Sequence, residues 1–93
     1  MGRLLSDEVA VVTGGGNGIG RAIAKRFADA GAAIVVADVD EDGGRETVDT
    51  IENEGGTAAF VETDVTDSDA VGALMEATVD EFGSLDVLVS NAG

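Results

Sequence analysis

Short apolar runs alternate with longer stretches whose apolar residues recur at helical spacing, and together they fill nearly all of the 93 residues. The apolar runs predict four strands, at residues 8–12, 33–38, 57–63 and 85–89. The stretches between them predict helices from residue 18 to Gly31, from about 40 to 54, and from 66 to Gly83. Helices between strands are typical of crossovers between parallel strands. The alternation therefore predicts one α/β domain with a doubly wound parallel sheet.

The helical stretches differ in how clearly one face is apolar. In the first, the apolar face holds Ile19, Ile23, Phe27 and Ala30, and the opposite face holds Arg21, Lys25 and Asp29. In the second, which is more polar, Val48 and Ile51 mark the apolar side. The third has the clearest apolar face, formed by Val71, Leu74, Met75, Val79 and Phe82, and Thr66 is expected to cap it with Asp69 three residues on. These faces are expected to pack on the sheet.

The turn between the first strand and the first helix is rich in glycine, with Gly14, Gly15, Gly16, Gly18 and Gly20 close together. In a doubly wound sheet, ligands bind beyond the carboxyl ends of the strands, where a phosphate meets a helix N-terminus. Side chains in this turn would hold a diphosphate away from the backbone N–H groups. At Gly20, inside the first helical turn, a Cβ would hold helix and strand apart. The turn therefore predicts a phosphate site, with a plain tight turn as the alternative.

Three glycine motifs can be tested against this turn. The pattern GxGxxG fails, because residue 19 is isoleucine. The phosphate loop of NTPases has the spacing of Gly15 and Gly20, but Arg21 and Ala22 stand where its lysine and its Mg²⁺-binding hydroxyl belong. The pattern TGxxxGxG fits, with the threonine at position 13 and glycines at 14, 18 and 20.

With this motif the chain resembles the short-chain dehydrogenase/reductase family. Three further features stand where that family has them: Asp38 ending the second strand, Asp64-Val65 ending the third, and Asn91-Ala92-Gly93 after the fourth. The resemblance covers the whole chain. It implies a Rossmann-like sheet of strand order 3-2-1-4, cut short after the fourth strand, in a single NAD-binding domain over residues 1–93. Val87, Leu88 and Val89 would then lie on an unprotected edge.

The resemblance also implies a role for each matching residue. Gly14, Asn17, Gly18 and Ile19 would line the pyrophosphate, with Gly20 belonging to the same cofactor loop. Asp38 would hold the adenosine ribose, Asp64 the adenine amine and Val65 the adenine ring. Asn91, Ala92 and Gly93 would pass beneath the cofactor, with Asn91 bracing the sheet. For the two aspartates, a helix cap is the structural alternative.

The choice of dinucleotide has a physical argument of its own. A carboxylate at position 38 accepts both ribose hydroxyl protons but repels a 2′-phosphate. NADP-preferring relatives tend to carry a basic residue in the glycine loop or just after the second strand, and this chain has Asn17 and Val39 there. NAD is therefore expected over NADP.

The chemistry of the family depends on residues that this sequence does not hold. Catalysis there falls to a serine, to the tyrosine and lysine of a YxxxK motif, and to a helix asparagine. The sequence has no tyrosine, and its lysine, Lys25, falls on the first predicted helix. We therefore expect the cofactor-binding part of an oxidoreductase acting on a small alcohol or ketone, with no catalytic residue among these 93. The alternative is a non-catalytic dinucleotide-sensing or protein-binding module.

Composition narrows the remaining classes. Cysteine and histidine are both absent, which argues against disulfides, most transition-metal sites and Ser-His or Cys-His relays. A net charge of -14 repels nucleic acid and anionic membranes, and no apolar run is long enough to span a bilayer. We expect a cytoplasmic protein with neither as partner, homo-oligomeric in its full-length form. The acidity suits a cytoplasm of high salt, or is that of an ordinary acidic protein.

Overall fold

The computed structural model describes residues 5–16 and 18–91. Along the chain its elements are β1 (Val9–Thr13), α1 (Gly18–Asp29), β2 (Ala33–Asp38), α2 (Glu41–Asn53), β3 (Thr57–Glu62), α3 (Ser68–Phe82) and β4 (Val87–Ser90). Each expected strand and helix is present, and most ends lie within one or two residues of the expected ones, the usual uncertainty of such boundaries.

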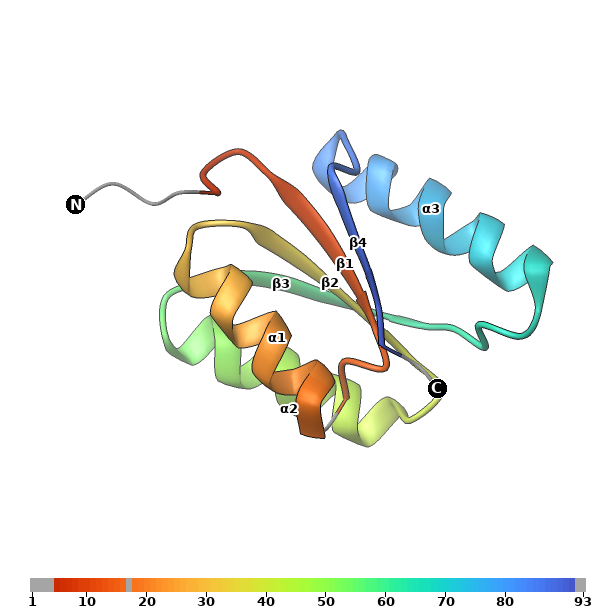
Figure 1. The fold of residues 1–93 in the computed structure, drawn as a ribbon, viewed down its shortest axis with the longest axis horizontal. Helices are drawn as coiled ribbons and strands as arrows, with labels where there is room; N and C mark the ends of the chain where they lie inside the picture. Colours follow the sequence, from red (N-terminus) through yellow and green to blue (C-terminus); the bar gives the residue numbers. More distant parts are fainter. Residues whose placement is uncertain (1–4, 17, 92–93) are drawn as a thin grey trace.

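All four described strands are parallel and lie in the order β3-β2-β1-β4, which confirms the expected topology. α1 and α2 cover one face of the sheet and α3 covers the other (Figure 1). Residue pairing aligns Thr13 of β1 with Ala37 of β2 and Ser90 of β4. The carboxyl ends of these strands therefore meet at one edge of the sheet, at the lower right of Figure 1.

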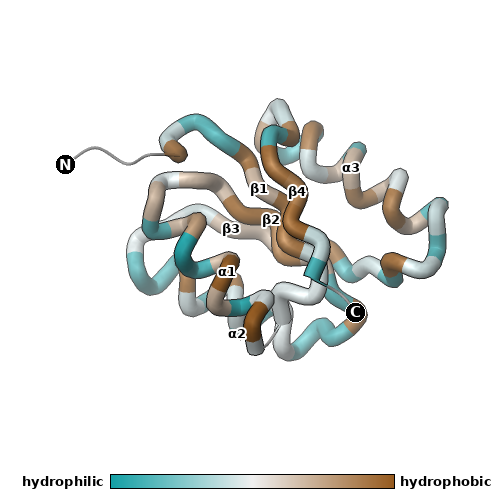
Figure 2. The backbone as a smooth tube through the Cα atoms, in the orientation of Figure 1, coloured by the Kyte–Doolittle hydropathy of each residue, from teal (hydrophilic) through white to brown (hydrophobic). Residues whose placement is uncertain are grey.

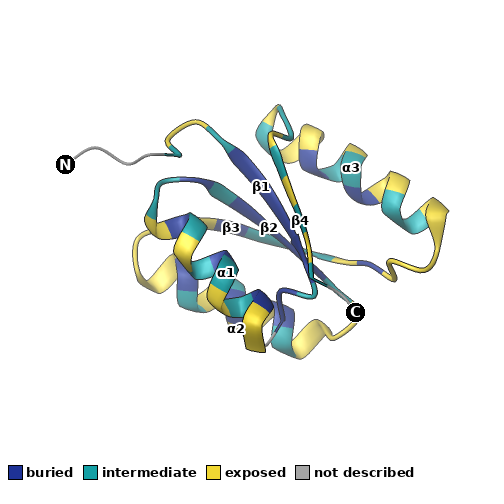
Figure 3. Ribbon diagram, viewed as in Figure 1, coloured by how far each residue is buried: buried dark blue, intermediate teal, exposed yellow. Residues whose placement is uncertain are grey.

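The two middle strands form the centre of the core. Every residue of β1 is buried (Figure 3), and the sheet is most apolar along β1, β2 and β4, whereas β3 is less so (Figure 2). Alternate side chains of β1 face opposite layers: Val12 packs with α1 and α2, whereas Val11 packs with α3. β4 lies at the edge of the sheet, as expected. On this strand Val87 and Val89 pack against the α1 side, whereas Leu88 is 49% exposed.

The apolar face expected for α1 is only partly correct. Its buried residues are Gly20, Ala24 and Ala28, whereas Ile19 is 72% exposed. Ile23 and Phe27 are partly buried on the flank of this small-residue stripe. The helix lies so close to the sheet that only small residues fit along the line of contact, and larger side chains are placed beside it.

The N-terminus of α3 differs from the expectation by one residue. Asp67, not Thr66, caps the helix: its carboxylate accepts from the backbone N–H groups of Asp69 (2.9 Å) and Ala70 (3.4 Å). Thr66 is instead held by Asp64, whose Oδ1 accepts from both its backbone N–H and its hydroxyl. Because Asp64 holds Thr66 in a turn, the helix begins only after Asp67, at Ser68.

The buried face of α3 is also rotated from the expected one. Leu74 and Thr78 are its fully buried residues, and Val79 is 47% exposed. The hydroxyl of Thr78 donates to the carbonyl oxygen of Leu74 at 2.8 Å, so the threonine is buried with its polar group paired. Hydropathy alone does not identify such a threonine as a core residue.

None of the helices within residues 5–16 and 18–91 combines the length and the apolar character that crossing a bilayer requires.

Candidate functional site

A cleft of about 280 Å³ opens at the carboxyl ends of the first three strands. It is lined by Gly14, Ala37, Asp38, Val39, Thr63, Asp64, Val65 and Thr66. Four of the residues expected at a cofactor site thus meet there, although they are far apart in the sequence. The other four lining residues immediately precede or follow expected ones, so the position of each strand end was the signal that could have identified them.

Asp38 is fixed at the end of β2 by backbone contacts on three sides. Its Oδ2 accepts from the N–H of Gly16 at 2.9 Å, and its Oδ1 accepts from the N–H of Asp40 at 3.0 Å. Its carbonyl oxygen accepts from Thr63 N–H at 3.0 Å, which joins the ends of β2 and β3. Because a carboxylate offers about four acceptor positions, both oxygens keep the capacity to accept further donors at the cleft.

Asp64 lies across the cleft on the loop after β3 and has a lowered pKa. The Thr66 hydroxyl donates to its Oδ1 at 2.6 Å and the Thr66 N–H donates at 2.9 Å. Both bonds favour the charged carboxylate, and the hydroxyl bond has the larger effect in holding the pKa below its ordinary value of 3.8. The carboxylate is therefore an acceptor throughout the neutral range.

Replacing Thr66 by alanine is expected to raise the pKa of Asp64. The pKa should remain below 3.8, because the backbone N–H of residue 66 still donates to the carboxylate. A lowered pKa adds stability above about pH 4 that is lost as the pH falls through the folded-state value, so the variant should lose this contribution at a higher pH. A ¹³C-detected NMR titration of the Asp64 carboxyl measures the change. Thr66→Ser keeps the hydroxyl and should titrate like the wild type; identical curves for all three proteins would contradict the assignment.

The glycine turn leads from β1 into α1. Gly14 has a φ of 66°, and its N–H donates to the carbonyl oxygen of Ala37 at 2.8 Å. α1 begins at Gly18, where an added Cβ would meet no atom within 4 Å. The first N–H groups of a helix have no acceptor within it and carry its positive dipole end. Gly18 and Ile19 are therefore exposed at a helix start that can accept an anion, outside the lining of the cleft.

Gly20 allows α1 to lie close to the glycine turn, and Asn91 joins the end of β4 to β1 and to that turn. A Cβ on Gly20 would overlap the carbonyl oxygen of Gly14 and lie 2.8 Å from Nδ2 of Asn91. The backbone N–H of Asn91 donates to the Thr13 hydroxyl at 3.0 Å, and its side-chain amide reaches the Gly14 carbonyl oxygen at 3.5 Å. A Cβ at position 20 would thus separate α1 from the turn, and Asn91 links β4 to β1; the roles of both residues at a cofactor stay predictions. The other expected site residues, Asn17, Ala92 and Gly93, lie outside the described residues.

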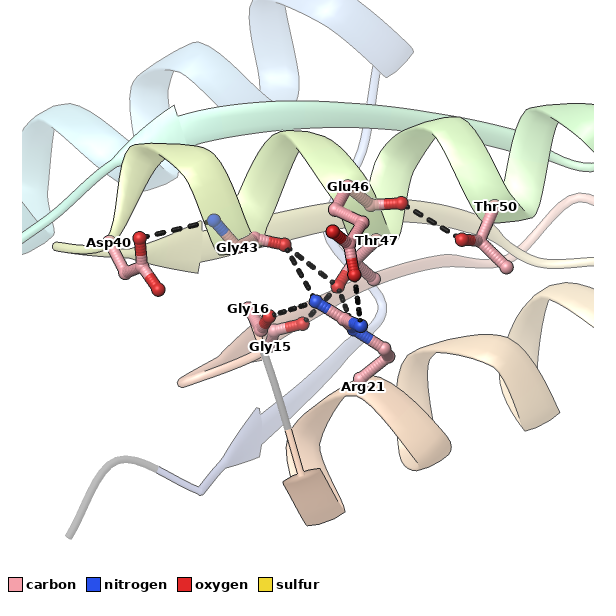
Figure 4. Close-up of polar contacts among 8 residues, drawn as sticks. All are labelled: Gly15, Gly16, Arg21, Asp40, Gly43, Glu46, Thr47 and Thr50. Atoms are coloured by element: carbon pink, nitrogen blue, oxygen red, sulfur yellow. Dashed lines mark hydrogen bonds and ion pairs between the residues drawn. The ribbon is translucent and has the colours of Figure 1, made fainter.

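One polar cluster at the site was missed from the sequence. Arg21, expected on the solvent face of α1, is partly buried, with 28% of its side chain exposed. It bonds to the glycine turn and to α2 (Figure 4). Its main partner, Thr47, is fully buried. Helical periodicity assigns an arginine opposite the apolar face to solvent, so no signal in the sequence distinguished this residue.

The comparisons with known proteins agree with this arrangement. A family model described as short chain dehydrogenase matches residues 8–93. A cis-4-hydroxycyclohexanecarboxylate dehydrogenase of Sinomonas cyclohexanicum is 50% identical over 93 residues, which are all of this chain and 37% of that protein.

Two solved structures have closely similar folds. A hydroxysteroid dehydrogenase from Escherichia coli has a TM-score of 0.93 at 40% identity, over 96% of this chain and 38% of that one. A citronellol catabolism dehydrogenase of Pseudomonas aeruginosa PAO1 has a TM-score of 0.95 at 32% identity, over 100% of this chain and 39% of that one. The chain thus spans well under half the length of these relatives. Because the family model matches all but the first seven residues, the chain belongs to the short chain dehydrogenase family.

Proposed function

We propose that the chain is the dinucleotide-binding part of an oxidoreductase that transfers a hydride between a nicotinamide cofactor and a small alcohol or ketone. The single observation that carries the proposal is the Asp38 carboxylate, held at the cleft beside a glycine turn that opens onto the start of α1. Family membership supports the class of reaction. The three relatives are named as dehydrogenases of hydroxylated compounds or of citronellol catabolism, which supports the substrate class.

In this proposal each expected residue keeps one role. Gly14, Asn17, Gly18 and Ile19 surround the pyrophosphate, with Gly20 setting the distance between α1 and the turn. Asp38 accepts from the adenosine ribose hydroxyls, Asp64 accepts from the adenine amine, and Val65 packs on the adenine ring. Asn91, Ala92 and Gly93 pass beneath the cofactor. The bound nicotinamide supplies or accepts the hydride, and the residues described here bind and orient the dinucleotide.

NAD is the proposed cofactor rather than NADP. Both Asp38 oxygens already accept from backbone N–H groups, so the carboxylate is held at a fixed position. Ribose hydroxyls can donate to it, whereas a 2′-phosphate would place a second negative charge beside it. Val39, which follows it at the cleft, offers no cation to a phosphate.

The proposal also covers the cellular location, the assembly and the partners of the protein. We place residues 1–93 in one dinucleotide-binding domain of a cytoplasmic homo-oligomer without nucleic-acid or membrane partners. A net charge of -14 on 93 residues favours a high-salt cytoplasm, because a Debye length of about 3 Å at 1 M salt screens the self-repulsion. The same charge repels an anionic dinucleotide at low salt.

The proposal is tested by calorimetric titration of the protein with NAD and with NADP, in 0.1 M and in 2 M KCl. We expect NAD to bind about tenfold more tightly than NADP, a difference of about 1.4 kcal/mol. Both affinities and the melting temperature should rise with salt. Equal affinities would contradict the role of Asp38, and absence of binding by either dinucleotide in both salts would contradict the function.

A further inference from the structure

The peptide group between Gly15 and Gly16 is hydrogen-bonded at both ends. The Gly16 N–H donates to Oδ2 of Asp38 at 2.9 Å, and the Gly15 carbonyl oxygen accepts from the hydroxyl of Thr47 at 2.8 Å. One rigid peptide plane thus connects a threonine of α2 to the carboxylate that ends β2, and a rotation of this plane moves both bonds together. The Gly16 carbonyl oxygen, which belongs to the next peptide group, accepts from Nη2 of Arg21 at 2.6 Å.

Arg21 is itself held by several contacts. Its Nε donates to the hydroxyl of Thr47 at 2.9 Å, and its Nη1 pairs with Glu46 at 2.6 Å (Figure 4). Its Nη2 also approaches the carbonyl oxygen of Gly43 at 3.3 Å. The planar guanidinium can satisfy such divergent acceptors at once, which a lysine ammonium cannot do with the same geometry.

Thr47 completes this support from inside α2. It is fully buried, and its hydroxyl donates toward the carbonyl oxygens of Gly15 (2.8 Å) and Gly43 (3.1 Å) while accepting from Arg21. The carbonyl group of Gly15 is therefore anchored by Thr47, and that of Gly16 by Arg21, which is itself bonded to Thr47. Removing the hydroxyl would leave the Arg21 Nε without this buried partner.

There is also little space for a side chain at position 16. A Cβ there would lie 2.7 Å from Oδ2 of Asp38 and 3.1 Å from the backbone nitrogen of Gly44. Any side chain at position 16 would therefore push the carboxylate away from the peptide that holds it. Direct contact between peptide and carboxylate requires a glycine here.

We propose that Arg21 and Thr47 are positioning residues for the Asp38 carboxylate, acting through the Gly15–Gly16 peptide group and the Gly16 carbonyl group, and that they set the discrimination between NAD and NADP. The inference rests on the proposed function. A carboxylate released from Gly16 can turn away from the ribose hydroxyls and from a 2′-phosphate. NAD then loses an acceptor while NADP loses a repulsion, so the ratio of the two affinities falls.

A purely structural role for the cluster makes a different prediction. If Arg21 and Thr47 only tie α1 to α2, their loss lowers the melting temperature and weakens both dinucleotides equally, without changing the ratio. The ratio of NAD to NADP affinity therefore distinguishes the two roles.

The test measures that ratio by calorimetry for Arg21→Gln, Arg21→Lys, Thr47→Val, Thr47→Ser and Gly16→Ala in the whole protein. We expect the ratio to fall about tenfold in R21Q, T47V and G16A, to fall less in R21K, and to stay at the wild-type value in T47S. Arg45→Gln is the matched control, because it removes an arginine charge from α2 whose ion pair with Glu41 is exposed. Its ratio should not change.

A second readout requires no cofactor. Hydrogen exchange of the Gly16 amide, followed by NMR, should accelerate about tenfold in R21Q and T47V but not in R45Q. An unchanged ratio and unchanged exchange in these two variants would overturn the inference. If R21Q does not fold, T47V and G16A decide it alone. If the wild type binds neither dinucleotide, the proposed function fails first, and normal amide exchange in R21Q would then reject the positioning role separately.

Discussion

Replacing Gly20 by alanine is expected to destabilise the fold by about 3 kcal/mol, at the upper end of the cost of overpacking. The added Cβ would overlap the carbonyl oxygen of Gly14 and lie 2.7 Å from its carbonyl carbon. Backbone atoms cannot turn aside as a flexible side chain can, so α1 must move away from β1. The gain in helix propensity from alanine, about 1 kcal/mol, offsets only part of this cost.

Thermal and urea denaturation followed by circular dichroism measure the effect. For a domain of this size the melting temperature should fall by roughly 12–24 °C, since each kcal/mol corresponds to about 4–8 °C. Gly72→Ala is the matched control: Gly72 lies in the interior of α3, and its Cβ would meet nothing within 4 Å. That variant should gain up to about 1 kcal/mol. A G20A protein as stable as the wild type would show that α1 has room to shift.

Most of the fold follows from patterns that act locally. The runs of β-branched residues in β1 and β2 predict buried strands because such side chains pack well on a pleated surface. Parallel strands joined by helices then restrict the topology. Asp38 and Asn91 could be placed at the carboxyl edge for the same reason, since each directly follows or ends a strand. Their placement at the same edge is a consequence of topology.

Other features depend on distances between elements, which a single sequence does not contain. Ile19 is exposed because Gly20 brings α1 too close to β1 for a larger residue between them. Arg21 is drawn inward by acceptors on α2 and on the glycine turn, neither of which is near it in helical spacing. Thr66 does not cap α3 because its hydroxyl is already bonded to Asp64, two residues earlier. In each case a tertiary or turn contact outweighs the local preference.

The other large effect is expected at Asp38, where replacement by asparagine should lower NAD affinity about 10- to 100-fold. A hydrogen bond to a charged group contributes about 1.5–3 kcal/mol, and the amide offers one oxygen where the carboxylate offered two. Its NH₂ group would also face a backbone donor, either Gly16 N–H or Asp40 N–H, that now bonds to Asp38. NADP should lose less, because the repulsion of its 2′-phosphate disappears with the charge.

Asp40→Asn is the control that separates the loss of direct contact at Asp38 from the loss of one negative charge nearby. Asp40 caps α2 by accepting from Gly43 N–H at 3.1 Å, and asparagine caps a helix about as well as aspartate. The two variants thus have the same net charge, changed two residues apart, so the general electrostatic repulsion of an anionic dinucleotide falls equally in both. Calorimetric titrations with NAD and NADP should show the ratio of affinities falling in D38N and holding in D40N. Equal ratios in both variants would mean that the field of the acidic surface, rather than contact at Asp38, discriminates between the two cofactors.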